Sequence, residues 1–301
     1  MAKYGLPYQG SKSKLAERIV DLLPSAKHLY DPFAGGCALT HAALLSGKWG
    51  CVHFSDITDS VVLFRDCLEG NIPDGSEWIS REEFFRRKDT DPYVRIVWSF
   101  GNNQRDYLYS RELEPYKKAV HEMLHAATPN ERRLKFKEVC RLMESVKCRP
   151  YDLEFAEKSE RLNSLKIGGG TTCIQSFEAA NRLVALADNR KTRATGRGAT
   201  PFLQREYEMK VADYRDIAIL PDSVIYCDIP YKGTREYRHD TFNHDAFYEW
   251  ALRQTAPLYI SEYSMPSDFE CVAEFERVST FSATNNALRK VERIYRPKNQ
   301  L

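Results

Sequence analysis

The chain lacks the sequence patterns of several common protein classes. Its eight cysteines include no C-x-x-C pair and show no metal-ligand spacing with the seven histidines, so neither a disulfide framework nor a metal site is expected. No apolar run approaches about 18 residues, and the N-terminus MAKYGLPYQG carries no signal-peptide pattern. We therefore expect a soluble, cytoplasmic protein whose cysteines are reduced thiols.

An excess of charge of one sign is also absent. The net charge of +2 does not by itself indicate a nucleic-acid partner. The basic residues are nevertheless clustered: residues 189–205 hold five Lys or Arg and no acid, and residues 131–150 hold seven against three Glu. Such clusters suit contacts with phosphates. A solvated helix face would give the second cluster the same composition.

The most informative segment is SVIYCDIPYKGT, residues 223–234, in which a short apolar strand ends at Asp228. This ending suits the alkylation of an exocyclic amine such as adenine N6. We expect Asp228 to accept one N–H of the amine and the Ile229 carbonyl to accept the other. We expect Tyr231 to stack on a base held outside the duplex. An Asp close before Pro230 is also ordinary turn chemistry, so the rest of the chain must decide.

Residues 27–47 supply that context, because an apolar strand there runs through Gly35-Gly36 into a helix. The glycines let a ligand approach the backbone, and the helix N-terminus offers unpaired N–H groups. Asp56 ends the next apolar run, about 20 residues on, where an acid binds ribose hydroxyls in dinucleotide-type folds. Asp31 would repel a pyrophosphate, and the full G-x-G-x-x-G fingerprint is absent. A positively charged nucleoside such as S-adenosylmethionine therefore fits better than a nicotinamide dinucleotide.

Four segments in a fixed order carry a family resemblance: YQGSK at 8–12, DPFAGG at 31–36, SDIT at 55–58 and DIPY at 228–231. With these motifs the chain resembles Dam-like adenine-N6 DNA methyltransferases, over about residues 1–64 and 207–301. The resemblance implies the α/β fold of S-adenosylmethionine-dependent methyltransferases, a mostly parallel sheet with helices on both faces and a reversed last strand. It also implies cofactor contacts from Tyr8, Lys12, Asp31, Phe33, Gly35, Asp56, Ile57, Asp213, Tyr214 and Asp228. The catalytic residues that it implies are Asp228, Ile229, Pro230 and Tyr231.

The chain departs from the family pattern at Ile229, where the usual residue is proline. The function of this position is a backbone carbonyl, which every residue has. Pro230 still biases Ile229 away from the helical region, although the fixed dihedral angle of a first proline is lost. We expect slower or unchanged chemistry, and not its loss.

Residues 65–206 become helical and charged, with breaks at 70–75 and 92–109. We interpret this segment as a DNA target-recognition domain inserted into a catalytic domain of residues 1–64 and 207–301. The polar stretch 98–105 is rich in side chains that read base edges, although amide-rich loops are also ordinary turns. The candidate DNA contacts are Asn102, Asn103, Gln104, Arg105, Arg193 and Arg197.

The expected reaction is methyl transfer from S-adenosylmethionine to N6 of an adenine flipped out of double-stranded DNA, with no metal. Two alternatives remain open: methylation of cytosine N4, and a catalytically weakened module that binds DNA and cofactor. The sequence leaves open whether a cognate restriction endonuclease accompanies the protein in a restriction-modification pair. A monomer is expected for an enzyme that modifies one base at a time.

Overall fold

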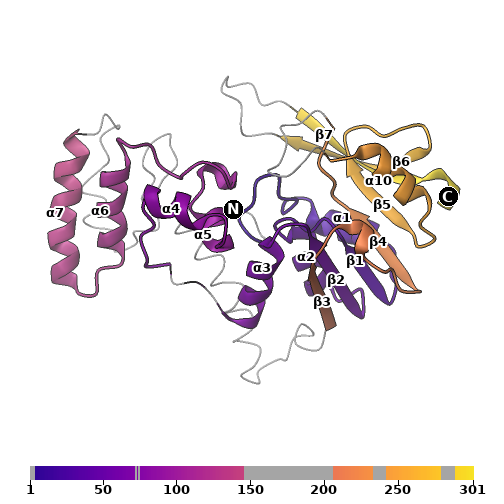
Figure 1. Ribbon diagram of the computed structural model, residues 1–301, viewed down its shortest axis with the longest axis horizontal. Helices are drawn as coiled ribbons and strands as arrows, with labels where there is room; N and C mark the ends of the chain where they lie inside the picture. Colours follow the sequence, from indigo (N-terminus) through magenta and orange to yellow (C-terminus); the bar gives the residue numbers. More distant parts are fainter. Residues whose placement is uncertain (1–3, 72, 74, 146–205, 233–241, 279–288) are drawn as a thin grey trace. The chain divides into compact units, whose positions relative to one another are not determined.

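The computed structural model describes residues 4–71, 73, 75–145, 206–232, 242–278 and 289–301, which form two compact units (Figure 1). The first unit contains residues 4–5, 10–65 and the described residues from 206 onward. The second contains Leu6–Gln9 and the described residues from 66 to 145. The division after residue 65 falls inside helix α3 (Ser60–Glu69).

The first unit is built on a seven-stranded sheet with the order β3-β2-β1-β4-β5-β7-β6. Its strands are β1 (His28–Asp31), β2 (Cys51–Asp56), β3 (Glu206–Val211), β4 (Ser223–Cys227), β5 (Leu258–Glu262), β6 (Phe269–Val278) and β7 (Arg289–Pro297). Strands β1 to β5 pair in parallel, whereas β7 is antiparallel to both of its neighbours. The predictions of an α/β fold and of a reversed last strand are therefore confirmed.

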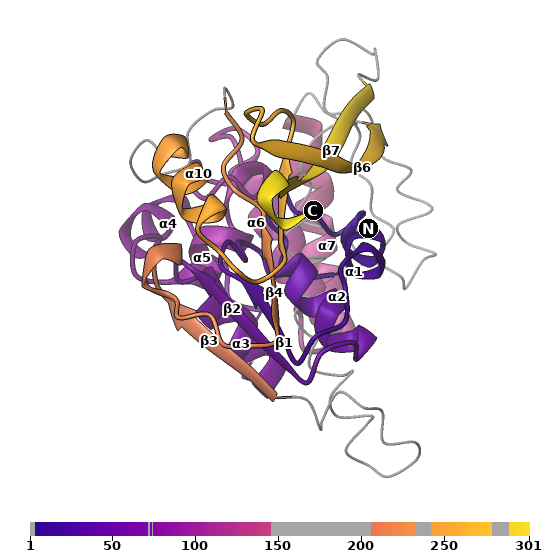
Figure 2. The same cartoon turned by 90° about the vertical axis from the view of Figure 1, so that its right-hand side faces the viewer.

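Helices cover both faces of this sheet. Figure 2 shows α1 (Ala16–Leu22) and α2 (Ala38–Ser46) on one side and α10 (His244–Leu252) on the other. On the α10 side, Phe247 and Ala251 pack in one apolar cluster with Ile225 of β4 and Ile260 of β5. All five residues of β4 are buried, as expected for a central parallel strand covered on both faces. Two short 3₁₀ helices, η4 (Tyr214–Asp216) and η5 (Lys298–Gln300), complete the described part of the unit.

The second unit is helical. Its helices are α4 (Arg81–Arg87), α5 (Pro92–Val97), α6 (Glu114–Leu124) and α7 (Pro129–Ser145), with the 3₁₀ turn η1 (Phe100–Asn102). Aromatic rings form much of its core, where Trp78 contacts Trp98, Tyr109 and His121. In the described part of the chain, no helix combines the length and the apolar character needed to cross a membrane.

The prediction of a break across residues 92–109 is wrong at its start, where α5 forms. Asp91 caps this helix, since its carboxylate accepts a hydrogen bond of 3.1 Å from the Val94 N–H. Pro92 then occupies the first turn, where its missing N–H costs nothing. The sequence therefore contained a helix-start signal that the polar residues after it concealed.

A close backbone approach at Gly5 fixes the start of α2. A Cβ atom on Gly5 would lie 2.4 Å from the Gly36 carbonyl oxygen and 2.7 Å from the Ala38 nitrogen, and the residue has φ +70°. The Gly5 N–H also donates to His41 Nδ1 at 3.1 Å. Only glycine fits here, because any side chain would push the backbone of the glycine turn away.

We predict that Gly5→Ala destabilises the protein more than Gly70→Ala does. Gly70 also has positive φ, +87°, but a Cβ atom on Gly70 would have no other atom within 4 Å. Gly70→Ala therefore costs only the left-handed backbone, about 1–2 kcal/mol. Gly5→Ala adds a steric term of about 1–3 kcal/mol. Urea unfolding followed by circular dichroism measures both, and equal losses would show that the clash at Gly5 relaxes freely.

Candidate active site

The carboxyl ends of β1 and β4 lie side by side at the centre of the sheet (Figure 2). From β1 the chain order runs outward to β2 and β3, and from β4 it runs the opposite way to β5. Such a switch point opens a crevice in which α/β proteins bind their ligands. Asp31 ends β1, and Asp228 directly follows β4. Two of the predicted site carboxylates therefore flank the point where the fold favours a ligand.

The glycine turn after β1 is tied to the end of β2. The Gly35 N–H donates to Asp56 Oδ2 at 2.8 Å, and the Gly35 carbonyl accepts from Ser60 Oγ at 2.7 Å. The Ala34 N–H donates to the Ser55 carbonyl at 2.9 Å. Gly35 adopts φ +49°, which suits a residue without a side chain. The turn is thus fixed beside the end of β2 by hydrogen bonds that the sequence alone did not reveal.

Asp56 combines this structural role with a capacity to bind a ligand. Its Oδ1 accepts from both the N–H and the hydroxyl of Thr58, at 2.9 and 2.7 Å. Among the described residues Oδ2 accepts only the Gly35 N–H, and a carboxylate oxygen can accept two hydrogen bonds. Ile57, which follows it, is 61% exposed. A hydroxyl acceptor and an exposed apolar side chain therefore adjoin at the end of β2.

Lys12 is buried between two carboxylates. Its Nζ lies 2.6 Å from Asp228 Oδ1 and 2.7 Å from Glu292 Oε1, and the side chain is only 6% exposed. Burial alone would lower the pKa of Lys12, but the two carboxylates outweigh it and raise the pKa above its ordinary value. Lys12 is therefore a cation that fixes one oxygen of Asp228.

Tyr231 belongs to the same network. Its hydroxyl donates to Glu292 and lies 3.3 Å from Ser261 Oγ, and its ring lies 4.6 Å from Lys12 Nζ. Tyr263 meets the ring edge-on at a centroid distance of 4.6 Å. The pKa of Tyr231 is raised, first by burial and then by the neighbouring carboxylates, so the hydroxyl keeps its proton. These contacts hold the ring in one orientation.

Glu292 and Ser261 were missed by sequence reasoning. They lie on β7 and β5, far along the chain from the DIPY segment. A weak signal was present, since Glu292 lies two residues before the apolar Ile294 and therefore shares its buried face of the strand. A carboxylate at such a position needs a buried partner, which Lys12 provides.

Asp31 is fully buried beside this network. Its Oδ2 accepts from Thr40 Oγ1 at 2.7 Å, and the side chain is 2% exposed. Burial raises the pKa of Asp31 to about 7; the Thr40 hydrogen bond opposes that rise, and the charges of Asp228 and Asp56 add to it. The carboxyl thus titrates close to neutral pH.

Ile229 is 2% exposed and packs in the apolar cluster with Phe247 and Ile260. Its side chain thus points into the core, while no hydrogen bond to its carbonyl forms among the described residues. The next carbonyl, that of Pro230, accepts from His244 Nε2 at 2.8 Å. Isoleucine stands where the family usually has proline, and its side chain packs in the core. Its carbonyl remains available to a ligand.

The other predicted cofactor contacts lie outside the network of Lys12, Asp228 and Glu292. Phe33 and Tyr214 contact each other at a centroid distance of 5.1 Å, and Tyr214 is buried among aromatic rings that include Trp250. Asp213 forms an ion pair with Arg215 at 2.8 Å, which holds the pKa of the Asp213 carboxyl below its usual value. Tyr8 belongs to the second unit.

The predicted base-reading amides form hydrogen bonds with their own loop and with the adjoining helix α5. Asn102 Nδ2 donates to the Ile96 carbonyl at 3.0 Å, Asn103 Nδ2 donates to Asp106, and the buried Gln104 accepts from Arg95 Nε at 3.2 Å. These bonds favour the turn-forming role that the sequence analysis left open. Arg105 is exposed. The remaining candidates, Arg193 and Arg197, lie outside the described residues.

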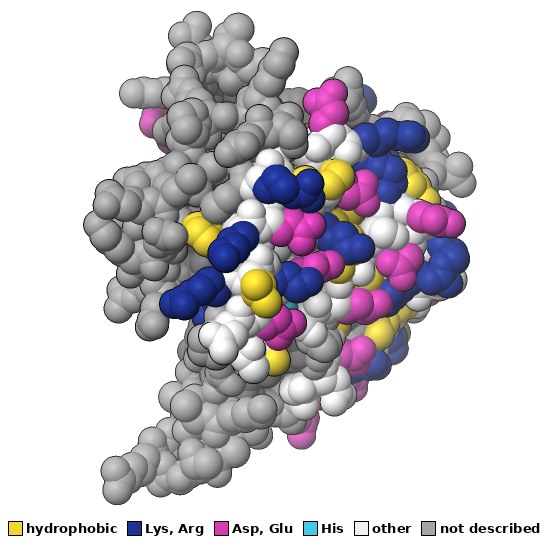
Figure 3. Space-filling model, turned by 90° about the vertical axis from the view of Figure 1, so that its left-hand side faces the viewer, with side chains coloured by type: hydrophobic (Ala, Val, Ile, Leu, Met, Phe, Trp, Pro, Cys, Tyr) yellow, Lys and Arg dark blue, Asp and Glu magenta, His cyan; other side chains and the backbone are white. Residues whose placement is uncertain are grey.

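Charges on α7 are mixed rather than segregated. Figure 3 views the side on which α7 lies in Figure 1, and there Lys and Arg side chains alternate with Asp and Glu. On α7 itself Lys135 pairs with Glu122 of α6 at 2.6 Å, and Arg141 lies 3.9 Å from Glu138. This described part of the basic segment 131–150 has the character of a solvated helix face.

Comparison with known proteins identifies the family. A search among curated protein sequences finds no match. A family model described as D12 class N6 adenine-specific DNA methyltransferase matches residues 8–156, about half of the chain. The match includes Lys12, Asp31, Gly35 and Asp56, which lie at or near the carboxyl ends of β1, β2 and β4. The chain therefore belongs to the D12 class of N6 adenine-specific DNA methyltransferases, enzymes that methylate adenine in DNA.

Proposed function

We propose that this enzyme transfers the sulfonium methyl group of S-adenosylmethionine to N6 of an adenine flipped out of double-stranded DNA, at Asp228, Ile229, Pro230 and Tyr231. The observation that carries the proposal is the position of Asp228, which follows β4 at the switch point and is ion-paired with a buried lysine. A side chain held there lies at the strand end beside the glycine turn, where α/β folds bind their ligands.

The cofactor in this proposal occupies the crevice between the ends of β1 and β4. Asp56 Oδ2 accepts a ribose hydroxyl, and the exposed Ile57 covers the adenine. Asp31 attracts the positive charge of the cofactor. The full proposed set is Tyr8, Lys12, Asp31, Phe33, Gly35, Asp56, Ile57, Asp213, Tyr214 and Asp228. Lys12 acts mainly through Asp228, because two carboxylates surround its ammonium group.

The methyl transfer is in line. Asp228 accepts one N–H of the adenine amine and the Ile229 carbonyl accepts the other, which draws the nitrogen toward tetrahedral geometry and exposes its lone pair. The N–CH₃ bond forms as the S–CH₃ bond breaks, leaving a neutral thioether, and the amine then releases one proton. Tyr231, fixed by Glu292 and Ser261, holds the base by stacking.

DNA recognition is assigned to the proposed insertion of residues 65–206, which contains the described helices α4 to α7. Arg105 is its exposed described candidate, and Arg193 and Arg197 are proposed phosphate contacts. Asn102, Asn103 and Gln104 contribute by shaping the loop that presents Arg105. A monomer suffices for this function, because one chain carries both assigned sites. A cognate restriction endonuclease is a further proposed partner.

The decisive experiment incubates the protein with methyl-labelled S-adenosylmethionine and unmethylated DNA, and identifies the labelled nucleoside by mass spectrometry. We predict that the native protein produces N6-methyldeoxyadenosine. The rate for Asp228→Ala should be lower by a factor of at least roughly 100. Asp268→Ala, an exposed carboxylate before β6, is the matched control and keeps the native rate.

Each other outcome identifies an alternative. N4-methyldeoxycytidine would replace the proposal by cytosine chemistry. Cofactor binding without any methylated nucleoside would indicate a weakened binding module. A native rate in Asp228→Ala would move the catalytic residue elsewhere.

We predict that Ile229→Pro changes the single-turnover rate by less than about tenfold, which is about 1.4 kcal/mol of activation free energy. The carbonyl is retained, while the buried isoleucine side chain is lost, so stability falls. Rapid-quench kinetics and thermal unfolding measure the two effects separately. A rate increase of several orders of magnitude would show that Ile229 cripples the native site.

Cofactor affinity should fall as the pH drops below 7. The Asp31 carboxyl, with its pKa raised to about 7 by burial, is ionised above this pH and protonated below it. A cationic ligand binds the ionised form better, so at lower pH binding must expel a proton, and affinity falls by up to about tenfold per pH unit. Calorimetric titration should show this slope in the native protein and a flatter profile in Asp31→Asn. Equal slopes would remove Asp31 from the binding site.

A further inference from the structure

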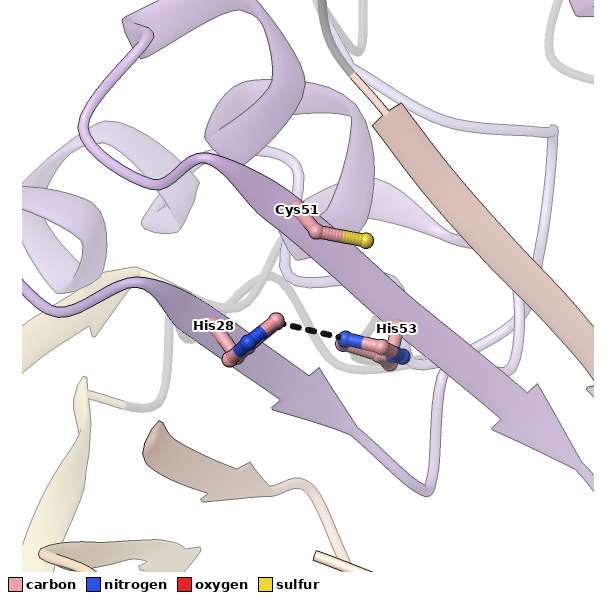
Figure 4. Close-up of side chains that lie close together, drawn as sticks. All are labelled: His28, Cys51 and His53. Atoms are coloured by element: carbon pink, nitrogen blue, oxygen red, sulfur yellow. Dashed lines mark hydrogen bonds between the residues drawn. The ribbon is translucent and has the colours of Figure 1, made fainter. Parts of the chain in front are cut away.

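Three side chains with metal-binding atoms converge on one face of the sheet, at the starts of β1 and β2. His28 is the first residue of β1, and Cys51 and His53 are the first and third of β2. His28 pairs in register with Cys51, and Tyr30 with His53. Residues two apart on a strand face the same way, so all three side chains share one face. Figure 4 shows the rings of His28 and His53 directed toward each other, with Cys51 beside them on β2.

The distances suit one metal ion. His28 Nδ1 lies 3.0 Å from His53 Nε2, and these two atoms and Cys51 Sγ all lie within 4.8 Å of one another. Zinc bonds of about 2.0–2.1 Å to nitrogen and about 2.3 Å to sulfur place tetrahedral ligand atoms roughly 3.3–3.6 Å apart. The three groups therefore need to move by only about 1 Å to surround an ion.

The orientation of His53 is fixed in the way that metal-bound histidines commonly are. Its Nδ1 lies 3.0 Å from Glu208 Oε2, so that Nδ1–H donates to the carboxylate and the Nε2 lone pair faces the cluster. Its ring stacks on Tyr30 at 4.2 Å with an interplanar angle of 3°. A carboxylate behind a ligating imidazole sets its tautomer and raises its basicity.

Three protein ligands leave the fourth tetrahedral position of a zinc ion to water. A small pocket of about 30 Å³ lies on the Glu208 side of the His53 ring and is also lined by Tyr30. Glu208 lies on β3, at the edge of the sheet, and its side chain is 62% exposed, which gives ions a route in.

We propose that His28, Cys51 and His53 bind one zinc ion, with water as the fourth ligand. Two imidazoles and one thiolate form a borderline-soft set that selects late first-row metals, whereas magnesium and calcium prefer oxygen ligands. Through Glu208, the ion also fastens β3 to β1 and β2. The site thus ties β3 to its neighbouring strands, and its residues are separate from the methyl-transfer residues.

The test adds Co²⁺ to the metal-free full-length protein and records its absorption, because cobalt bound to a thiolate gives a sulfur-to-metal charge-transfer band. We expect one equivalent, displaced by Zn²⁺. Cys51→Ser should lose the band, and Glu208→Gln should bind roughly 10–100-fold more weakly. Cys271→Ser, which removes an exposed thiol on β6, is the matched control and should keep it.

The proposal is overturned if the native protein shows no band, if Cys51→Ser retains it, or if Cys271→Ser loses it. Should Cys51→Ser fail to fold, alkylation of the native protein gives the same answer. Zinc should then slow the modification of Cys51, mapped by mass spectrometry, and leave that of Cys271 unchanged. Equal rates at Cys51 with and without zinc would contradict the site.

Discussion

The buried ammonium group of Lys12 is the contact on which the active site depends. It joins three distant parts of the chain: the segment before α1, the loop after β4 and the reversed strand β7. A charge in such a place is tolerated only with partners, and removing one partner of a buried pair costs about 3–5 kcal/mol. Loss of Lys12 or of Glu292 should therefore destabilise the whole group and disturb the position of Asp228.

The topology of the sheet explains why this contact is possible. Parallel strands β1 and β4 bring Asp31 and Asp228 together at the carboxyl ends of the strands. Folds with this topology bind their ligands there. The antiparallel β7 then brings Glu292 to Lys12 and Tyr231. This reversed strand supplies the carboxylate that holds both the lysine and the aromatic ring.

Local sequence patterns predicted the parts of this arrangement that are local in the chain. The buried strand before Asp228, the glycine turn at Gly35 and the acid at Asp56 each follow from short-range patterns of apolar, glycine and acidic residues. α5 was missed because its capping residue Asp91 precedes a stretch rich in polar side chains. The catalytic roles of the DIPY residues came from motif chemistry and family resemblance, and they remain predictions.

Contacts between distant segments could not be predicted in this way. Glu292 meets Lys12 only because β7 pairs with β5. His28 meets Cys51 and His53 only because β1 and β2 pair in one particular register. The expectation of no metal site was based on the spacing of cysteines and histidines in the sequence, which does not contain this register. Gln104 looked like a base reader, yet its partner is Arg95. Register and crossovers, which arise from the whole sheet, determined these outcomes.

A double-mutant cycle of Lys12→Met and Glu292→Gln tests the central role of the Lys12 contact most directly. The quantity measured is the single-turnover rate of methyl transfer to DNA. If Lys12 positions Asp228 with the help of Glu292, the double variant is no slower than the worse single variant, and the coupling is about 0.5–3 kcal/mol. If the two losses simply add, the lysine and the glutamate act independently, and the network is not what holds the catalytic carboxylate.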